Sequence, residues 1–384
     1  MKIRKLQTSE HGKTRTLWEQ VFPEDSREFL DYYYFLKTQE NEIYVVEEKE
    51  KFCSMLQLNP YQIQMGEQTF IGHYIIAVAT DPAYRKRGFM GTLLRRSMQD
   101  MYDRGELFTF LMPADERIYT PYDFRFVYDQ DVFTYVRKAE DEKALEKGNY
   151  ELLEASYGDG SMLATFFNDH FADRYQIYAT RDEHYYQTLV FEQQSEHGGV
   201  RILKRENCVI GTFLYGDEGE LEIREALCLS GYENAMYGAF SMLCKEKGYQ
   251  VAQVAASSWN HKKEQVEKNP VIMFRILHLE DILKILKVKK GEKIDCSFAV
   301  LDPLLTRNSR VWRLTGGEEK NQIIVSETED SEGILTIGAM SDLLFGYRTI
   351  EEIAQEENVF LTEHLMMELK KLEPLDRIFL NEIV

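Results

Sequence analysis

The chain has 384 residues, a formal net charge of −19 and 44% hydrophobic residues. Because a single hydrophobic core stops growing at about 250–300 residues, this length predicts two or three domains. The acidic balance argues against DNA or RNA as a partner, since proteins that bind nucleic acids carry a basic surface. It suits a small cationic molecule, although acidity that serves only solubility explains the charge equally well.

The cysteines and the apolar runs bear on the cellular compartment. The five cysteines lie far apart and form no CxxC pair, which indicates a reducing cytoplasm and argues against disulfides or a zinc site. No apolar run reaches the roughly 18 residues that span a bilayer, and the opening MKIRKLQTSEHGK lacks the apolar core of a signal peptide. We therefore expect a cytoplasmic protein with no membrane span and no metal.

The first third of the chain predicts two helices followed by strands. Apolar residues at helical spacing favour a helix over 9–22 that ends before Pro23, and Asp25 or Ser26 caps a second helix. Strands are expected at 43–48, 51–58, 69–79 and 107–112, with a helix between the last two that carries Met90, Leu93, Leu94 and Met101 and ends at Gly105. The order is three strands, a turn, a helix and a strand.

A similar order recurs after a charged stretch at 137–149, which is typical of a linker. Strands are expected within 200–217, at 221–229 and at 251–257, with a helix at 232–249. The recurrence predicts a duplicated domain that kept the fold and lost a basic glycine turn present in the first copy. The alternative is that any two halves rich in helices and strands look this alike.

From about Met273 the pattern changes again. Antiparallel strands are expected at 294–303, 309–317 and 321–329, then a strand and short helix at 335–347 closed by Gly346, and a further helix at 349–357. The chain ends in RIFLNEIV, an unusually apolar terminus. Such an end favours a docked terminus over a frayed one, and a simple core strand is an equal alternative.

The segment YRKRGFMGTLLRR at 84–96 holds five of the 46 basic residues at a strand-to-helix turn. A helix N-terminus presents unpaired N–H groups and partial positive charge, and glycines allow a phosphate to approach the backbone. Arg85, Lys86 and Arg87 surround Gly88 and Gly91. This pattern predicts a cradle for a diphosphate, and neither a Walker A loop nor a GxGxxG motif is present. The alternative is a basic surface run at a helix start.

The stretch AVATDPAYRKRGFMGTLL resembles motif A of the Gcn5-related N-acetyltransferases, the GNAT family. Arg85–x–x–Gly88 matches the family's Arg/Gln–x–x–Gly–x–Gly/Ala, with Met90 at the last small position. That departure is typical of the enhanced-intracellular-survival (Eis) branch. A second stretch, IYTPYDFRF at 118–126, resembles the Eis-type Ile–Tyr–x–x–Phe/Tyr–Gly–Phe/Tyr, with Asp123 in place of the glycine.

The resemblance implies an α+β fold class: two tandem GNAT folds, each a mixed twisted sheet flanked by helices, followed by a domain like sterol carrier protein 2 (SCP2). The expected boundaries are 1–138 for the catalytic GNAT domain, 139–271 for a degenerate second one and 272–384 for the SCP2-like domain. Relatives of the Eis type also suggest a homo-oligomer, such as a hexamer.

The resemblance further implies acetyl-CoA as co-substrate and assigns roles to individual residues. Tyr119 would protonate the departing thiolate as general acid, and the terminal carboxylate of Val384 would act as general base. The helix pair near the acceptor would contribute Trp18, Phe22, Asp25 and Tyr34, beside Asp31. The residues expected to bind the coenzyme are Val78, Ala79, Thr80, Arg85, Lys86, Arg87, Gly88, Phe89, Met90, Gly91, Ala114 and Asp115.

The predicted function is transfer of an acetyl group from acetyl-CoA to a primary amine of a small cationic acceptor, aminoglycoside-like or polyamine-like, by direct attack on the thioester. The alternatives are a protein-lysine acetyltransferase and a non-catalytic protein that binds coenzyme A or lipid. Single residues also have structural alternatives: Tyr119 as an ordinary core tyrosine, the helix-pair aromatic residues as core, and His73 as a structural histidine.

Overall fold

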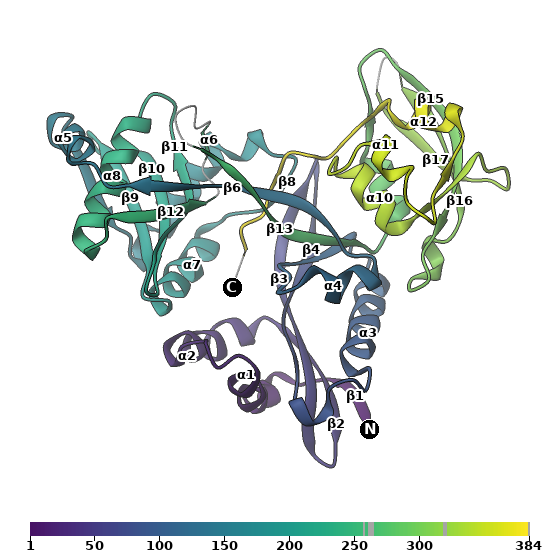
Figure 1. Ribbon diagram of the computed structural model, residues 1–384, viewed down its shortest axis with the longest axis horizontal. Coiled ribbons are helices and arrows are strands. Elements are labelled where there is room, and N and C mark those ends of the chain that lie inside the picture. The colour runs from purple at the N-terminus through teal and green to yellow at the C-terminus, as the bar shows by residue number, and fades with distance from the viewer. Residues whose placement is uncertain (256–257, 260–264, 318–320, 383–384) are drawn as a thin grey trace.

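The computed structural model describes residues 1–255, 258–259, 265–317 and 321–382, arranged as three packed units (Figure 1). The first unit contains strands β1 (Lys2–Lys5), β2 (Glu42–Glu48), β3 (Lys51–Met65), β4 (Gln68–Thr80) and β5 (Phe108–Leu111), with helices α1 (Arg15–Val21), α2 (Arg27–Phe35), α3 (Phe89–Asp103) and α4 (Glu116–Tyr119). The predicted order of helices and strands is confirmed. Ser26 caps α2 by accepting a hydrogen bond from the Phe29 N–H at 3.0 Å.

The second unit repeats this plan. It contains α5 (Ala139–Lys147), β7 (Tyr150–Glu154), α6 (Gly160–His170), β8 (Ile177–Ala179), α7 (Glu183–Ser195), β9 (Gly199–Arg205), β10 (Cys208–Asp217), β11 (Leu221–Cys228), α8 (Glu233–Lys247) and β12 (Val251–Ala255). Residues 256–257 of the predicted strand 251–257 lie outside the described residues. The prediction that 137–149 is a linker is wrong, because this stretch forms α5. This helix packs on α8 and buries Leu145.

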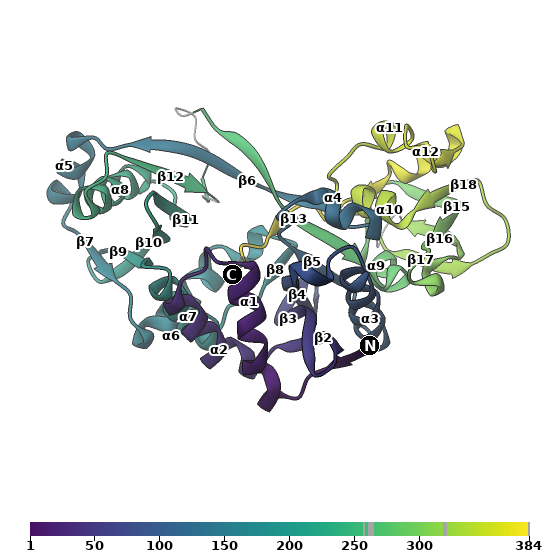
Figure 2. The same cartoon turned by 60° about the horizontal axis from the view of Figure 1, so that its bottom comes forward.

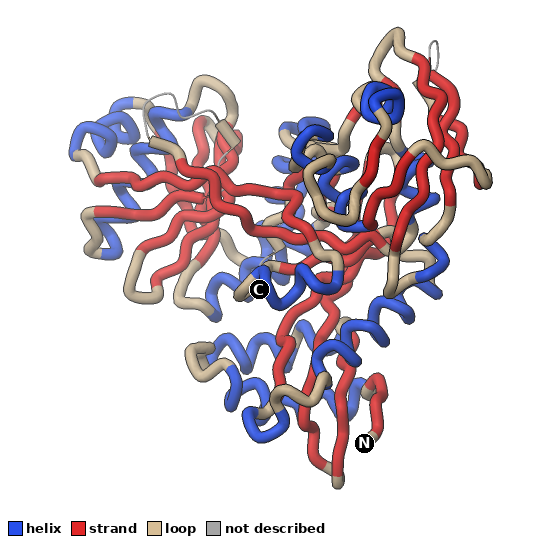
Figure 3. The backbone as a smooth tube through the Cα atoms, turned by 45° about the vertical axis from the view of Figure 1, so that its right-hand side comes forward, coloured by secondary structure: helices blue, strands red, loops and turns tan. Residues whose placement is uncertain are grey.

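Two long strands, β6 (Arg125–Val136) and β13 (Glu267–Ile276), join the first two units. They pair with each other, β13 pairs with β5, and β6 pairs with β12. One sheet therefore runs through both units in the order β1-β2-β3-β4-β5-β13-β6-β12-β11-β10-β9-β7. Figure 2 shows β6 and β13 bridging the two units, and Figure 3 shows the continuous run of strands.

The third unit is built on a five-stranded sheet of order β17-β16-β15-β18-β19. Its elements are α9 (Leu279–Ile285), β14 (Lys287–Val288), β15 (Lys293–Leu301), β16 (Val311–Gly317), β17 (Ile323–Glu327), β18 (Gly333–Thr336), α10 (Ile337–Leu344), α11 (Ile350–Ile353), β19 (Phe360–Leu361), α12 (Glu363–Leu369), β20 (Leu372–Glu373) and β21 (Ile378–Phe379). Phe345 packs edge-on against Phe274 of β13 at 5.0 Å, so the core continues into the first unit.

Short 3-10 helices complete the chain at Thr8–Thr14, Lys37–Gln39, Pro82–Tyr84, Thr120–Tyr122, Tyr157–Asp159, Ala172–Arg174 and Thr306–Asn308. The first of these forms the beginning of the predicted helix 9–22.

Within the residues described, each helix is too short or too polar to cross a bilayer. His73 is a buried structural residue, as expected, because its Nδ1 contacts Glu106 at 2.8 Å.

The end of the chain returns to the middle of the molecule (Figure 1). Strand β21 pairs in parallel with β8, which in turn pairs with β3 of the first unit. Leu380 is fully buried and Glu382 is 4% exposed. The apolar terminus is therefore docked up to Glu382, the last described residue.

Candidate active site

Strands β4 and β5 diverge at the end that leads into α3. Among the described residues their register contains one pair, Tyr74 with Phe110, and β4 continues to Thr80. Ala77 adopts a left-handed conformation, with φ of +50°, next to a register shift against β3. Such a bulge bends the strand and turns its backbone away from the neighbour. The predicted residues Val78, Ala79 and Thr80 follow this bulge.

The turn after β4 presents positive charge and backbone N–H groups to solvent. Arg85, Lys86, Arg87 and Gly88 are all exposed. Gly88 is the N-cap of α3 with φ of +78°, and no side chain caps that helix end. The orphan N–H groups and the helix dipole are available to an anion. The predicted residues Phe89 and Gly91 are buried and Met90 is half-buried.

Gly91, which is predicted to bind the coenzyme, also makes a close packing contact. A Cβ atom at Gly91 would lie 2.2 Å from the Tyr122 hydroxyl, so only glycine allows this tyrosine to pack on the first turn of α3. The Arg95 guanidinium lies over the same ring at 5.4 Å. Gly91 thus ties the segment that carries Tyr119 to the start of α3.

Tyr119 ends the short helix α4, close to the splayed strands. Asp115 caps this helix by accepting from the Arg117 N–H at 3.0 Å, and Ala114 is exposed in the loop before it. Tyr119 is 8% exposed, and no described residue makes a hydrogen bond with its hydroxyl. Burial raises the pKa of Tyr119 to about 12, so the phenol stays protonated at neutral pH.

The residue in place of the expected glycine has the backbone that glycine favours. Asp123 has φ of +62°, in the left-handed region. Asp and Asn tolerate this region better than other non-glycine residues. The departure from the family pattern at Asp123 therefore leaves the local backbone unchanged.

A cavity of about 960 Å³ lies between the first and second units. Trp18, Phe22 and Asp25 line it, as does the bulge of β4 at Ala77. Asp25 accepts a hydrogen bond from the Trp18 indole at 2.6 Å. Tyr34 does not line this cavity: its hydroxyl contacts the Thr14 hydroxyl at 2.9 Å, and its ring packs edge-on against Trp18. The exposed Asp31 pairs with Arg15, away from the cavity lining.

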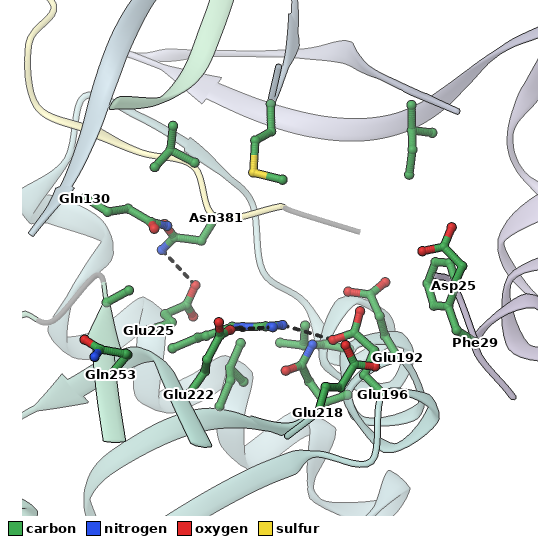
Figure 4. A pocket seen from close by; sticks show the side chains of 18 of the residues that line it. Asp25, Phe29, Gln130, Glu192, Glu196, Glu218, Glu222, Glu225, Gln253 and Asn381 are labelled. Carbon is green, nitrogen blue, oxygen red and sulfur yellow. Dashed lines mark hydrogen bonds and ion pairs between the residues drawn. The ribbon is translucent and has the colours of Figure 1, made fainter. Parts of the chain in front are cut away.

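The lining of the cavity is strongly acidic. Among the described residues that line it there is one arginine, Arg224, and there are seven carboxylates: Glu24, Asp25, Glu192, Glu196, Glu218, Glu222 and Glu225. Arg224 is already paired with Glu196 at 3.0 Å and Glu222 at 2.7 Å. Figure 4 shows Glu192, Glu196 and Glu218 gathered on the side that faces Asp25. Two further cations lie behind the lining, because Lys37 is 3.7 Å from Glu192 and Arg181 pairs with Glu225. Seven carboxylates against these two cations and Arg224 still leave an excess of negative charge, which favours a cation in this cavity.

Burial and mutual repulsion perturb two of these carboxyl groups. Burial, with smaller contributions from Glu192 and Glu218 and against the lowering effect of Arg224, raises the pKa of Glu196 to about 7. Burial also raises the pKa of Asp25, against the lowering effect of the Trp18 hydrogen bond. Perturbed carboxyl groups that converge on one cavity are typical of a functional site.

The C-terminal segment contributes Asn381 to the cavity wall. Its side-chain amide donates to Glu225 at 3.0 Å and accepts from Gln130 at 2.9 Å (Figure 4). Val384, the predicted general base, lies outside the described residues. Sequence reasoning also missed the glutamates of the second unit. The signal for three of them was the acidic run GDEGELEIRE at 216–225, which as a sequence is typical of a solvated hairpin.

Comparisons with known proteins agree with this architecture. Residues 2–127 match the family described as acetyltransferase (GNAT) domain, and residues 279–383 match the sterol carrier protein domain. No curated protein sequence matches the chain. Three solved structures are similar in fold over 100% of this chain and 98–100% of their own.

The first is a conserved protein of unknown function from Enterococcus faecalis, described as a probable N-acyltransferase, with 18% identity and a TM-score of 0.81. The second is a GCN5-related N-acetyltransferase from Kribbella flavida, with 15% identity and a TM-score of 0.79. The third is Eis1 from Mycobacterium abscessus, with 13% identity and a TM-score of 0.73. At these identities the likeness concerns the fold.

Proposed function

We propose that this chain, an Eis-like protein of the GNAT acetyltransferase family, transfers an acetyl group from acetyl-CoA to a primary amine of a small cationic acceptor. The observation that carries the choice of acceptor is the cavity, whose described lining has seven carboxylates against three paired cations, Arg224 in the lining and Lys37 and Arg181 behind it. GNAT domains use acetyl-CoA, and the turn at 85–88 fits its diphosphate.

The coenzyme would be held by the first unit. Gly88 leaves the start of α3 open, and Arg85, Lys86 and Arg87 supply positive charge beside it. The pantetheine arm would lie along β4, where the backbone at 78–80 diverges from β5. The bulge at Ala77 is shared between this strand and the acceptor cavity, so the thioester and the amine would meet there.

The reaction forms one bond and breaks one. The neutral amine nitrogen bonds to the acetyl carbonyl carbon, the carbon–sulfur bond breaks, and the proton lost by nitrogen passes to a base. Tyr119 acts as general acid by donating a hydrogen bond to the thiolate as the carbon–sulfur bond breaks, and the released thiolate takes its proton from solvent. Because the phenol pKa of about 12 exceeds the roughly 8.5 of a thiol, donation of a hydrogen bond to the developing thiolate is the dominant contribution of Tyr119.

The terminal carboxylate of Val384 is the proposed base. Asn381, three residues before Val384 in the sequence, lines the cavity, which supports this proposal. Val384→Ala keeps the carboxylate and should retain most activity. Two added residues after Val384 displace the carboxylate and should lower kcat at least tenfold with an unchanged melting temperature. Equal turnover in the extended, folded protein would remove this role.

A protein lysine is a less suitable acceptor than a small amine. The cavity is walled by two units, and the hydrogen-bonded Gln130 and Asn381 form part of its wall. A lysine on a folded surface would bring bulky neighbours to this opening. Incubation with acetyl-CoA and a panel of polyamines, aminoglycosides and lysine peptides, with detection of released thiol, tests the proposal. If no amine in the panel caused release of the thiol, the proposed acetyl transfer would be contradicted.

Two further expectations stay predictions. The scattered cysteines favour a cytoplasmic protein, and the resemblance suggests a homo-oligomer such as a hexamer. Light scattering of the purified protein measures the second property directly.

A further inference from the structure

The bulge at Ala77 has a counterpart in the second unit. Glu225 of β11 has φ of +49°, beside a register shift between β10 and β11. Each bulged strand leads into a long helix, α3 or α8. Both bulges line the same cavity from opposite units. Left-handed backbone at a non-glycine residue inside a strand is uncommon and is retained only where the surroundings enforce it.

The second bulge lies in a setting unlike a coenzyme site. At the start of α8 the Glu233 carboxylate accepts from the Gly231 N–H at 3.0 Å, so a negative charge lies where a phosphate would bind. Strands β11 and β12 stay paired from Glu222 to Arg224, up to the bulge. We therefore look for a role of the β11 bulge other than coenzyme binding.

That role is visible in the partners of the Glu225 side chain. Its carboxylate forms a two-pronged ion pair with Arg181, whose Nη2 donates to Oε2 at 2.9 Å and whose Nη1 contacts Oε1. Arg181 is fully buried, and its guanidinium lies over the rings of Phe167 at 4.3 Å and Phe379 at 5.0 Å. Buried charges persist only when paired, so Glu225 and Arg181 fix one another.

The same pair holds the end of the chain. Asn381 donates to Oε2 of Glu225 at 3.0 Å and accepts from the Tyr128 hydroxyl at 3.1 Å. The buried Glu382 lies 3.6 Å from Arg181 and accepts from the Tyr185 hydroxyl at 2.9 Å. The last two described residues are thus bound to the bulge of β11 and to its arginine.

We propose that Glu225 is a positioning residue of the acyl transfer. Through Arg181 and Asn381 it fixes the segment that ends at Glu382 against the acceptor cavity. The second GNAT-like unit then takes part in the reaction, because the bulge of β11 binds the C-terminal segment at Asn381 and Glu382. The expected effect of Glu225 on kcat rests on the proposed function, whereas its binding of the C-terminal segment does not.

The test is Glu225→Gln in the full-length protein, with Glu220→Gln as matched control. Glu220 is exposed in the same hairpin and its variant loses the same charge. Hydrogen exchange of the amides at 380–382 should become at least tenfold faster in Glu225→Gln and stay unchanged in the control. With the best amine, kcat should fall at least tenfold, while the Kd of acetyl-CoA stays within twofold.

A second variant covers the case in which Glu225→Gln does not fold. Asn381→Ala keeps the Arg181–Glu225 pair and removes the hydrogen bonds of the Asn381 side chain with Glu225, Tyr128 and Gln130, so it should give the same two effects. The proposal would be overturned if amide hydrogen exchange at 380–382 stayed unchanged in both variants. It would also be overturned if that exchange became faster while kcat stayed at the wild-type value. A wild-type protein that acetylates no amine overturns the proposed function instead, and hydrogen exchange still decides whether Glu225 holds the tail.

Discussion

Ala77 and Glu225 have the same left-handed backbone, with φ of +50° and +49°, and face one cavity from two different units. In the first unit the bulged residue is an alanine, and it lies where β4 diverges from β5. In the second unit it carries a carboxylate that binds the chain end. One local backbone feature thus occurs twice, with the side chain suited to each place.

The backbone at Ala77 makes a direct prediction for stability. Ala77→Val should lower the free energy of unfolding by about 1–2 kcal/mol, because a β-branched side chain fits left-handed backbone poorly. Ala77→Gly, which adopts this conformation freely, should stay within about 0.5 kcal/mol of the wild type. Urea denaturation measures both. A valine variant as stable as the glycine variant would show that the bulge is not maintained in solution.

The turn at Gly88 predicts where the coenzyme binds. Gly88→Glu places a carboxylate at the open start of α3 and should abolish acetyl-CoA binding in calorimetry. Gly88→Asn suits the positive φ without adding charge and should bind within about tenfold of the wild type. The wild type should bind one equivalent per chain, since Glu233 occupies the corresponding helix start of the second unit. Two equivalent sites per chain would contradict this account.

The hydroxyl of Tyr119 should matter to turnover and little to binding. Tyr119→Phe should lower kcat and kcat/KM together by about 10²–10⁴-fold, the usual effect of losing a general acid. The Kd of acetyl-CoA and the melting temperature should change little, because no described residue bonds to that hydroxyl. Tyr102→Phe on α3 serves as control. Wild-type turnover across pH, with chemistry limiting the rate, would assign Tyr119 to packing.

The raised pKa of Glu196 predicts a pH dependence of stability. Its value of about 7 in the folded protein exceeds the unfolded value near 4.5, so the folded state binds more protons between these pH values. The contribution of Glu196 to stability is therefore present at low pH and falls as pH rises from about 4.5 to about 7. Glu196→Gln should flatten this decline, by on the order of 1–3 kcal/mol, in denaturation curves measured across pH.

The control for this prediction is Glu220→Gln, which removes one exposed carboxylate from the nearby hairpin. It should leave the slope of stability against pH unchanged. An unchanged slope in Glu196→Gln as well would mean that Glu196 titrates normally.

The sequence predicted the features that depend on local pattern. The helix cap at Ser26, the open turn at Gly88 and the strand order of the first unit follow from residue type and spacing. The helix α5 was mistaken for a linker, because its buried face is narrow and its other faces are charged. Charged residues at helical spacing hide such a helix when apolar residues are few.

The acceptor cavity was only partly predictable, since its walls come from segments far apart in the chain. Trp18 and Asp25 came from a family resemblance, and Tyr34 on the same helix pair packs behind them. Glu192 and Glu225 belong to the second unit and line the same cavity as Asp25 because α2 packs on α7 and one sheet runs through both units. No spacing within the sequence reports such a contact.

The most direct measurement of the central claim compares acceptors that differ only in charge. The account predicts that kcat/KM with acetyl-CoA is at least 100-fold higher for a linear triamine than for a monoamine of equal length that ends in a hydroxyl, and that an amine ending in a carboxylate reacts slowest. Added salt should reduce the preference, because screening shortens to about 8 Å at 0.15 M ionic strength. Equal or better turnover of the carboxylate-bearing amine would contradict the claim that the acidic cavity selects a cationic acceptor.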